Sequence, residues 1–493
     1  MKSPTSLFAR CLTVLLITLF AVSPAWATCG GGGGGGGGGM SGGSSSGNSA
    51  PETYPVPWKI RDAKTPPAKG LVVYWFPASQ DEIKKSSLRM SRTLSLYASQ
   101  CISMELADTN VPNADKLLGE SKRPVAVIAT PEGEPVTKVE NTDGKLKVEA
   151  VEKVLSTEMK GRESALDQQL KDAKAKAAAG EKDEAIKLFQ AVAEQKCMFP
   201  AKAKSAAKEL KKLGVNEVAS LADGPEFAVP VFEARQSAQI VRTMHQGLIA
   251  ENGASYLVAE KLYQRAHSLD PADPTPLRYL GELYRHHIGD WEKAKTTFDA
   301  ILNMPADPLS RAVALHGLGK ITIHEGEFKK GLHLMEQSVD EYPLALAYRN
   351  LAVYWNSEGD LKQGNAYTQK ALALDPKDPY NLVFAAVFMA ASGQKDEALK
   401  VARANMNLLP ASYNLAAIYA QNGQRDKALA FLKRHFYQYE RYHAVRSKEM
   451  MEARVDAVFN SIRLDSDFIA LTRHADGRLM MPMKDIGTSS ENK

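Results

Sequence analysis

The sequence predicts a small α/β domain followed by an all-α solenoid of stacked helical hairpins. Three observations predict this fold class. Short apolar runs of strand type are confined to residues 58–160, a helical pattern recurs every 33 or 34 residues beyond residue 239, and prolines and glycines stand at matching places in each copy. A chain of 493 residues is also too long for one core, so several units are expected.

The first 27 residues have the three parts of a signal peptide. Lys2 and Arg10 supply positive charge, residues 12–22 are apolar, and an A-x-A cleavage pattern ends at residue 27. We therefore expect an exported protein that is periplasmic or tethered to the cell envelope. No later segment is long and apolar enough to span a bilayer.

Residues 28–57 are rich in Gly and Ser and predict a disordered tether. Cys29 is a candidate lipidation site, because a cysteine followed by glycine also begins bacterial lipoproteins. The alternative is plain cleavage after Ala27. Contact with a membrane is expected only through a lipid anchor at Cys29.

The charge balance argues against a nucleic-acid partner. Net charge is +5 for the full chain, and two of the positive charges lie in the predicted leader. The remaining Lys and Arg residues form no basic stripe, which a nucleic-acid-binding surface needs.

Six copies of one pattern cover residues 239–440. The first helix of the pattern has a large residue, then a pair such as Leu280-Gly281, then an aromatic residue. The second helix has a small residue and an apolar residue four positions later. Pro343 and Pro376 are 33 residues apart, Pro376 and Pro410 are 34 apart, and Gly247 and Gly281 are 34 apart. Close approach of the paired helices requires the small residues, for example Gly319.

This pattern resembles the tetratricopeptide (TPR) repeat family. Single repeats cannot bury their apolar faces, so the resemblance implies a superhelical array that binds other proteins. A related hairpin is expected at 161–213, with a linker at 214–238. Capping helices are expected at 441–472 and a flexible tail at 473–493.

The strand-type runs order the domain at 58–160. We expect helices at 81–100 and 145–159 and strands at 71–76, 102–106, 124–128 and 135–139. The order and the local segments LVVYWFPAS and RPVAVIATPEGEPVTKV resemble thioredoxin. The resemblance implies a structural cis-proline at Pro124. The alternative is a generic small α/β domain.

The redox motif of that family is missing. Its CxxC would fall on residues 79–82, which read Ser-Gln-Asp-Glu. Without a thiolate there, thiol–disulfide exchange by the usual route is excluded, and the resemblance implies a redox-inactive binding module. Export would permit a disulfide between Cys101 and Cys197, but the sequence alone does not establish one.

The TPR register also identifies candidate partner-binding positions on the first helices. They are Arg278, Glu282, Arg285, His316, Lys320, His324, Arg349 and Asn356. Four of them are Lys or Arg, which favours an acidic protein or peptide partner. The alternative is a solvated basic surface.

No catalytic, cofactor-binding or metal-binding motif is expected. The five histidines between 286 and 333 include no pair four residues apart on one helix, as a helical zinc motif requires. The sequence therefore predicts a non-catalytic interaction scaffold or adaptor in the cell envelope. Two alternatives stay open, a holdase-type chaperone with a redox-inactive thioredoxin domain and a thiol oxidoreductase that uses Cys101 or Cys197.

Overall fold

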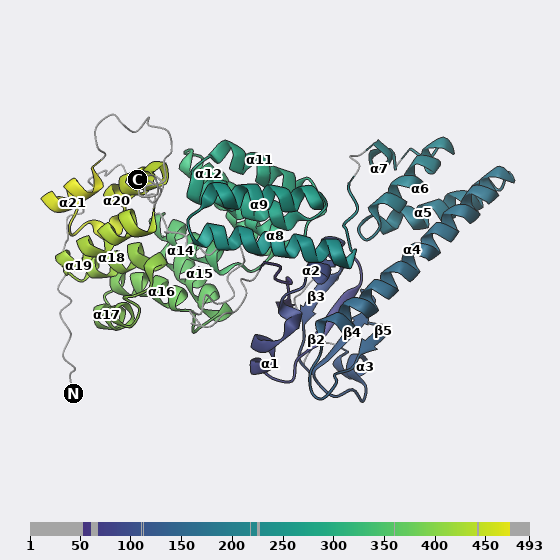
Figure 1. Cartoon of the computed structure of the whole chain (residues 1–493), viewed down its shortest axis with the longest axis horizontal. Helices are drawn as coiled ribbons and strands as arrows, with labels where there is room; N and C mark the ends of the chain where they lie inside the picture. Colours follow the sequence, from purple (N-terminus) through teal and green to yellow (C-terminus); the bar gives the residue numbers. More distant parts are fainter. Residues whose placement is uncertain are drawn as a thin grey trace, which may run out of the picture.

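The computed structural model describes residues 53–60, 68–109, 111, 113–216, 218–223, 227–358, 360–440 and 443–473. The expected signal peptide, Cys29 and nearly all of the expected tether and tail lie outside these residues. Figure 1 shows a sheet domain and a helical hairpin at one end of an elongated molecule and a curved array of helices at the other. Among the helices of the described residues, none combines the length and the apolar character that a membrane span needs.

One mixed sheet forms the core of the first domain. Its strand order is β1-β3-β2-β4-β5, and β1, β3 and β2 run parallel. Strand β4 is antiparallel to β2, and β5 is antiparallel to β4. The central strand β2 is buried throughout because its alternate side chains enter apolar clusters on both faces of the sheet. The strands are β1 (Lys59–Ile60), β2 (Val72–Phe76), β3 (Ser103–Leu106), β4 (Val125–Ala129) and β5 (Pro135–Val139).

The peptide bond between Arg123 and Pro124, just before β4, is cis, which is the isomer that the resemblance implied. The single helix expected over 81–100 is divided into α1 (Gln80–Lys85), η1 (Ser87–Arg89) and α2 (Arg92–Ser99). The side chains of Ser86 and Ser91 accept hydrogen bonds from backbone amides downstream and cap new helical starts. Serine side chains compete with continued helix in this way.

A long helix joins the sheet domain to the hairpin. The helix expected to end at residue 159 continues as α4 (Val148–Ala178), so the expected boundary at residue 160 falls inside one element. It packs on β5 at one end and on α5 at the other, and both contacts use one apolar stripe. The other helices of this region are α3 (Ala114–Leu118), α5 (Lys182–Ala193), η2 (Glu194–Lys196), α6 (Pro200–Lys212) and α7 (Ala219–Asp223).

Six antiparallel helix pairs follow at the expected period within 234–440. The first helices of the pairs are α8 (Ala234–Asn252), α10 (Pro274–Glu282, continuing as η3, Leu283–Ile288), α12 (Pro308–His324), α14 (Ala345–Ser357), α16 (Pro379–Ala391) and α18 (Ser412–Gln421, preceded by η4, Leu409–Ala411). The second helices are α9 (Tyr256–Leu269), α11 (Trp291–Leu302), α13 (Phe328–Glu341), α15 (Leu361–Leu374), α17 (Lys395–Ala404) and α19 (Arg425–Arg434, continuing as η5, His435–Tyr439).

Two sequence features explain how each pair forms. Asp273, Asp307 and Asp378 cap first helices, and each is followed by proline at the first helical position. A Cβ atom added to Gly319 of α12 would lie 2.8 Å from the carbonyl oxygen of Gly331 in α13. Only glycine fits such an approach of two helix backbones, as the repeat pattern predicted.

The sheet domain docks on the helix array through a buried ion pair. Arg92 of α2 forms ion pairs with Asp270 and Asp273, which stand between α9 and α10, and its Nε donates to Asp273 Oδ2 at 3.0 Å. The Tyr54 hydroxyl donates to the same Asp273 oxygen at 2.8 Å. All four side chains are at least 95% buried. The docking is therefore a specific contact and not a flexible connection.

Cys101 and Cys197 form a disulfide, with a Cα–Cα distance of 5.7 Å. It joins the turn before β3 to the turn before α6, which are 96 residues apart in sequence. The neighbouring Met198 packs into the apolar cluster of the sheet. The expected separate hairpin at 161–213 is thus anchored to the sheet domain by both covalent and apolar contacts.

Candidate functional site

The sequence-predicted residues belong to a polar surface on successive first helices, which we call the first-helix face. Arg278 Nη1 donates to Ser310 Oγ at 3.3 Å, and Lys320 Nζ donates to the Tyr354 hydroxyl at 3.0 Å. The Arg349 guanidinium donates to the side-chain oxygen Oδ1 of Asn381. Asn350 Nδ2 lies 2.6 Å from His316 Nε2. Each contact joins one first helix to the next, so these polar groups connect the repeats.

These residues are buried and not solvated. Arg278 is fully buried, and His316, Lys320 and Arg349 are exposed by 2%, 5% and 8%. Burial is the main cause that lowers the pKa of His316 to about 3, so its imidazole is neutral at pH 7. The sequence placed these residues on one surface but could not show that neighbouring elements cover them.

Glu282 and Arg285 form an internal pair on this face. The Arg285 Nη2 atom lies 2.6 Å from Glu282 Oε2, and Nε donates to Oε1 at 3.2 Å. Burial alone would raise the pKa of Glu282, but the Arg285 guanidinium holds it below the usual range. The Arg285 guanidinium therefore already has an ion-pair partner within this face. The remaining predicted position, Asn356, is in α14, and its side chain lies outside the described part of the chain.

The C-terminal segment of the same chain covers the first-helix face. It contains α20 (His443–Val455), η6 (Ala457–Phe459) and α21 (Ser466–Thr472), where capping helices were expected. Helix α20 contacts η3, η5 and η6. Glu452 of α20 lies 2.7 Å from His324 Nδ1, and Glu449 forms a hydrogen bond with His435 Nε2. The segment thus returns from the last repeat to the second one and places carboxylates against the face.

Helix α20 combines two kinds of contact. Glu449 and Glu452 are three residues apart, a spacing that places both carboxylates on one side of a helix. Both are buried, and Met450 and Ala453 of the same helix join the apolar cluster of the last repeats. The covering element is therefore an amphipathic helix with an acidic stripe.

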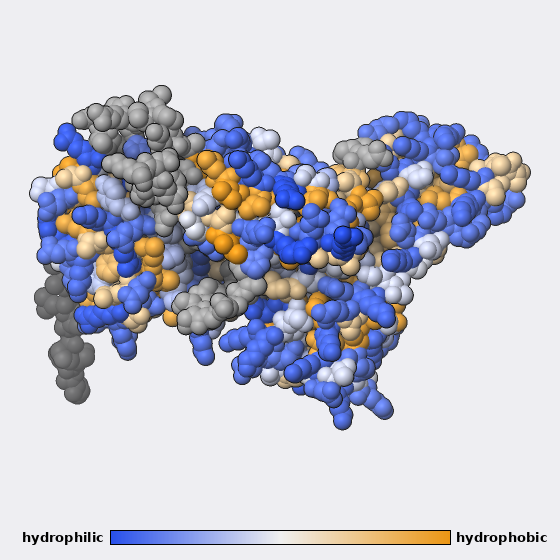
Figure 2. Space-filling model, viewed as in Figure 1, coloured by the Kyte–Doolittle hydropathy of each residue, from blue (hydrophilic) through white to orange (hydrophobic). Residues whose placement is uncertain are grey.

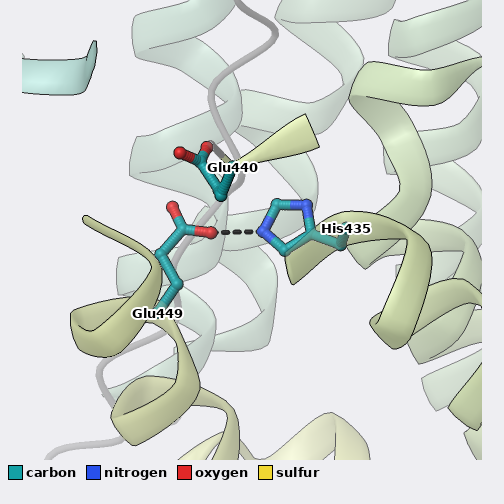
Figure 3. A group of neighbouring side chains, drawn as sticks. All are labelled: His435, Glu440 and Glu449. Atoms are coloured by element: carbon teal, nitrogen blue, oxygen red, sulfur yellow. Dashed lines mark hydrogen bonds and ion pairs between the residues drawn. The ribbon is translucent and has the colours of Figure 1, made fainter. Parts of the chain in front are cut away.

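Three buried side chains converge where α20 meets the last repeat (Figure 3). One ligand-type atom from each of His435, Glu440 and Glu449 lies within 4.8 Å of the other two. Burial and the nearby Glu449 charge raise the pKa of Glu440 well above its usual range. Burial would also raise the pKa of Glu449, but the adjacent His435 lowers it below the usual value. One carboxyl is thus held neutral and the other ionised.

Sequence reasoning missed all three members of this cluster. His435 was not among the histidines considered, because it lies beyond the cluster at 286–333. The spacing of residues 435, 440 and 449 matches no ligand motif on a continuous helix. Their convergence depends on the chain turning back after η5, and no local pattern encodes that turn. The stripe at Glu449 and Glu452 was the only readable signal.

The positions where the missing CxxC motif would fall include a residue that caps a helix. Ser79 is the N-cap of α1, at the end of β2, and its hydroxyl accepts from the Glu82 amide at 3.1 Å. Cys101 and Cys197, the cysteines that were candidates for thiol chemistry, are joined to each other.

Comparisons with known proteins give weak matches. No family model matches the sequence. The curated Protein CTR9 homolog of Arabidopsis thaliana is 23% identical over 239 residues, which cover 38% of this chain and 22% of that protein. The chain thus spans about a fifth of that relative's length.

Two solved structures resemble part of the chain. MamA is 17% identical and covers 39% of this chain and 94% of its own, with a TM-score of 0.22. YrrB, described as a TPR protein with an unusual peptide-binding site, is 21% identical and covers 38% of this chain and 97% of its own, with a TM-score of 0.24. Such scores carry no structural argument. The helix pairs and their repeat in this chain themselves define a TPR-like helical solenoid.

Proposed function

We propose that this protein is a non-catalytic interaction scaffold of the cell envelope that binds a protein partner through the first-helix face. The single observation that supports the proposal is the position of α20. The face contains buried cationic and imidazole groups, and α20 places Glu452 against His324 of this face and Glu449 against His435 of the last repeat. A surface that accepts an acidic amphipathic helix from its own chain has the chemistry to accept one from a partner.

The sheet domain is a second binding surface in this proposal. Its strand order, with β2 at the centre and β4 and β5 antiparallel, supports the thioredoxin-like interpretation. The serine at the N-cap of α1, where that family has its first redox cysteine, supports a redox-inactive role. The charged start and apolar run of residues 1–27 support export, and Cys29 supports a lipid anchor.

The contacts of α20 support a narrower description of the partner than the sequence alone supported. The partner segment is a helix with two carboxylates three residues apart and small or flexible apolar residues beside them. On the surface visible in Figure 2, hydrophobic residues occur as separate patches among hydrophilic ones. A recognition mode based on charge and helix shape fits this surface better than broad apolar capture of unfolded chains.

A peptide of residues 443–456 tests the proposal on the full-length chain. Glu449→Gln with Glu452→Gln in the protein weakens its own covering helix, and fluorescence anisotropy then measures binding of the added peptide. We expect a Kd of about 1–100 μM, because the desolvation cost of burying charged groups cancels much of the attraction between them. Raising the salt concentration from about 0.05 to about 0.5 M should weaken binding.

The matched control is the same peptide with both glutamates replaced by glutamine. It should bind at least about tenfold more weakly, which corresponds to about 1.4 kcal/mol. Equal binding of the two peptides would show that the carboxylates do not matter. No binding of either would exclude the first-helix face as a surface for acidic helices.

A further inference from the structure

The cluster of His435, Glu440 and Glu449 contains a buried polar atom that has no hydrogen-bond partner among the described residues. The three residues are exposed by 0%, 2% and 7%. Glu440 Oε1 is buried and has no hydrogen-bond partner within the described residues. Figure 3 shows its carboxylate beside the Glu449–His435 pair. A buried carboxylate oxygen without a partner normally costs stability, so the arrangement points to a missing ligand.

The distances in the cluster match those around a single ion. Nitrogen and oxygen ligands lie about 2.0–2.2 Å from zinc, so two of them are separated by at most about 4.4 Å across the metal. The three ligand-type atoms lie within 4.8 Å of one another, so an ion between them draws the outermost atoms together and opens the short His435–Glu449 hydrogen bond. His286 Nδ1 lies 3.9 Å from Glu440 Oε1. That distance is too long for a hydrogen bond but suits two ligands of one ion.

The chain positions the three ligands from two elements. His435 begins η5, and the Glu440 amide donates to the His435 carbonyl at 2.9 Å, which holds these two residues together. The imidazole also contacts the ring of Tyr413 edge-on, with centroids 5.3 Å apart. Glu449 comes from α20. An ion at this point would therefore connect the last repeat to the covering helix.

The Arg, Lys and His side chains near the cluster have contacts with other residues. Arg285 is paired with Glu282, and Lys320 donates to Tyr354. His324 is paired with Glu452. Glu440 and Glu449 are the two carboxyl groups of the cluster. Two carboxylates balance the charge of one divalent cation.

We propose that His435, Glu440 and Glu449 bind a divalent transition-metal ion, with His286 as a fourth donor. A mixed imidazole and carboxylate set suits Zn²⁺, Co²⁺ or Mn²⁺ and has no thiolate for softer ions. The site shares Glu449 with the proposed partner surface, but metal binding needs no partner and can be measured without one.

Metal binding to the full-length, tag-free protein tests the site. Replacing Cys11 and Cys29 with serine removes the two cysteines outside the disulfide, and chelator treatment precedes the titration. We expect one Zn²⁺ per chain by calorimetry. Added Co²⁺ should give visible absorption bands of a four- or five-coordinate site, and Zn²⁺ should displace them. Failure to bind either ion, or binding without these bands, overturns the proposal.

Three variants separate a site from adventitious binding. Glu440→Gln, Glu449→Gln and His435→Gln should each lower the Zn²⁺ affinity at least about a hundredfold, since each removes a direct ligand. Glu341→Gln is the control, because it removes a carboxylate that pairs with Arg311 outside the cluster. Its affinity should stay within about threefold of the parent. If every folded ligand variant binds like the parent, the cluster is not the site.

Discussion

Replacing Arg92 with methionine should lower the free energy of unfolding by about 3–5 kcal/mol. The guanidinium is 95% buried and neutralises Asp270 and Asp273 at the junction of the sheet domain and the helix array. Methionine keeps the length and apolar stem but leaves two carboxylates buried without a cation. Breaking a buried pair from one side has this cost because the remaining charge loses its compensation. Urea unfolding of the full chain measures the effect.

The matched control is Arg311→Met. Arg311 forms an ion pair with Glu341 at 3.0 Å, but both side chains are about one-third exposed. Water and salt screen such a pair, and we expect a loss of only about 0.2–1 kcal/mol. Similar losses for the two variants would contradict the description of the junction as a buried electrostatic contact.

The second large effect is expected from the disulfide. Replacing both Cys101 and Cys197 with serine removes a crosslink between residues 96 apart in sequence. A crosslink that closes a loop of about 100 residues restricts the unfolded chain, and its loss costs about 4.7 kcal/mol in the chain-entropy description. The hairpin should then separate from the sheet domain at lower urea concentration, as fluorescence and limited proteolysis would show.

The reducing agent provides an internal control for this prediction. Reduced wild-type protein should unfold at about the urea concentration of the double-serine variant, and the reductant should not change the variant. If wild type unfolds at the same concentration in both redox states, the disulfide does not stabilise the domain contact.

Much of the architecture was readable from sequence because it is encoded locally. The period between Pro343 and Pro376 and the small residue at Gly319 predicted the helix pairs, because each reflects contacts inside one repeat. Short apolar runs of strand type predicted the strands. The capping serines that divide 81–100 were also visible in the sequence, but the helical pattern was given more weight than Ser86 and Ser91.

The candidate site was only half predictable. The repeat register correctly grouped Arg278, Lys320 and Arg349 on successive first helices, since that depends on spacing alone. Their burial comes from tertiary contacts between neighbouring helices, such as Arg278 with Ser310 and Arg349 with Asn381. Contacts between residues as distant as His286 and Glu440 are set by the tertiary path of the chain. No periodic pattern in one segment contains that information.

The central claim is that α20 occupies the surface that a partner uses, and locking α20 in place tests it most directly. His324→Cys with Glu452→Cys, in a background with Cys11→Ser and Cys29→Ser, places two thiols where the side chains of His324 and Glu452 lie 2.7 Å apart. A short bismaleimide locks the helix, and capping both thiols separately leaves it free. The proposal predicts that the free form captures a partner from envelope extract and the locked form does not. Capture of the same proteins in equal amounts by both forms would contradict it.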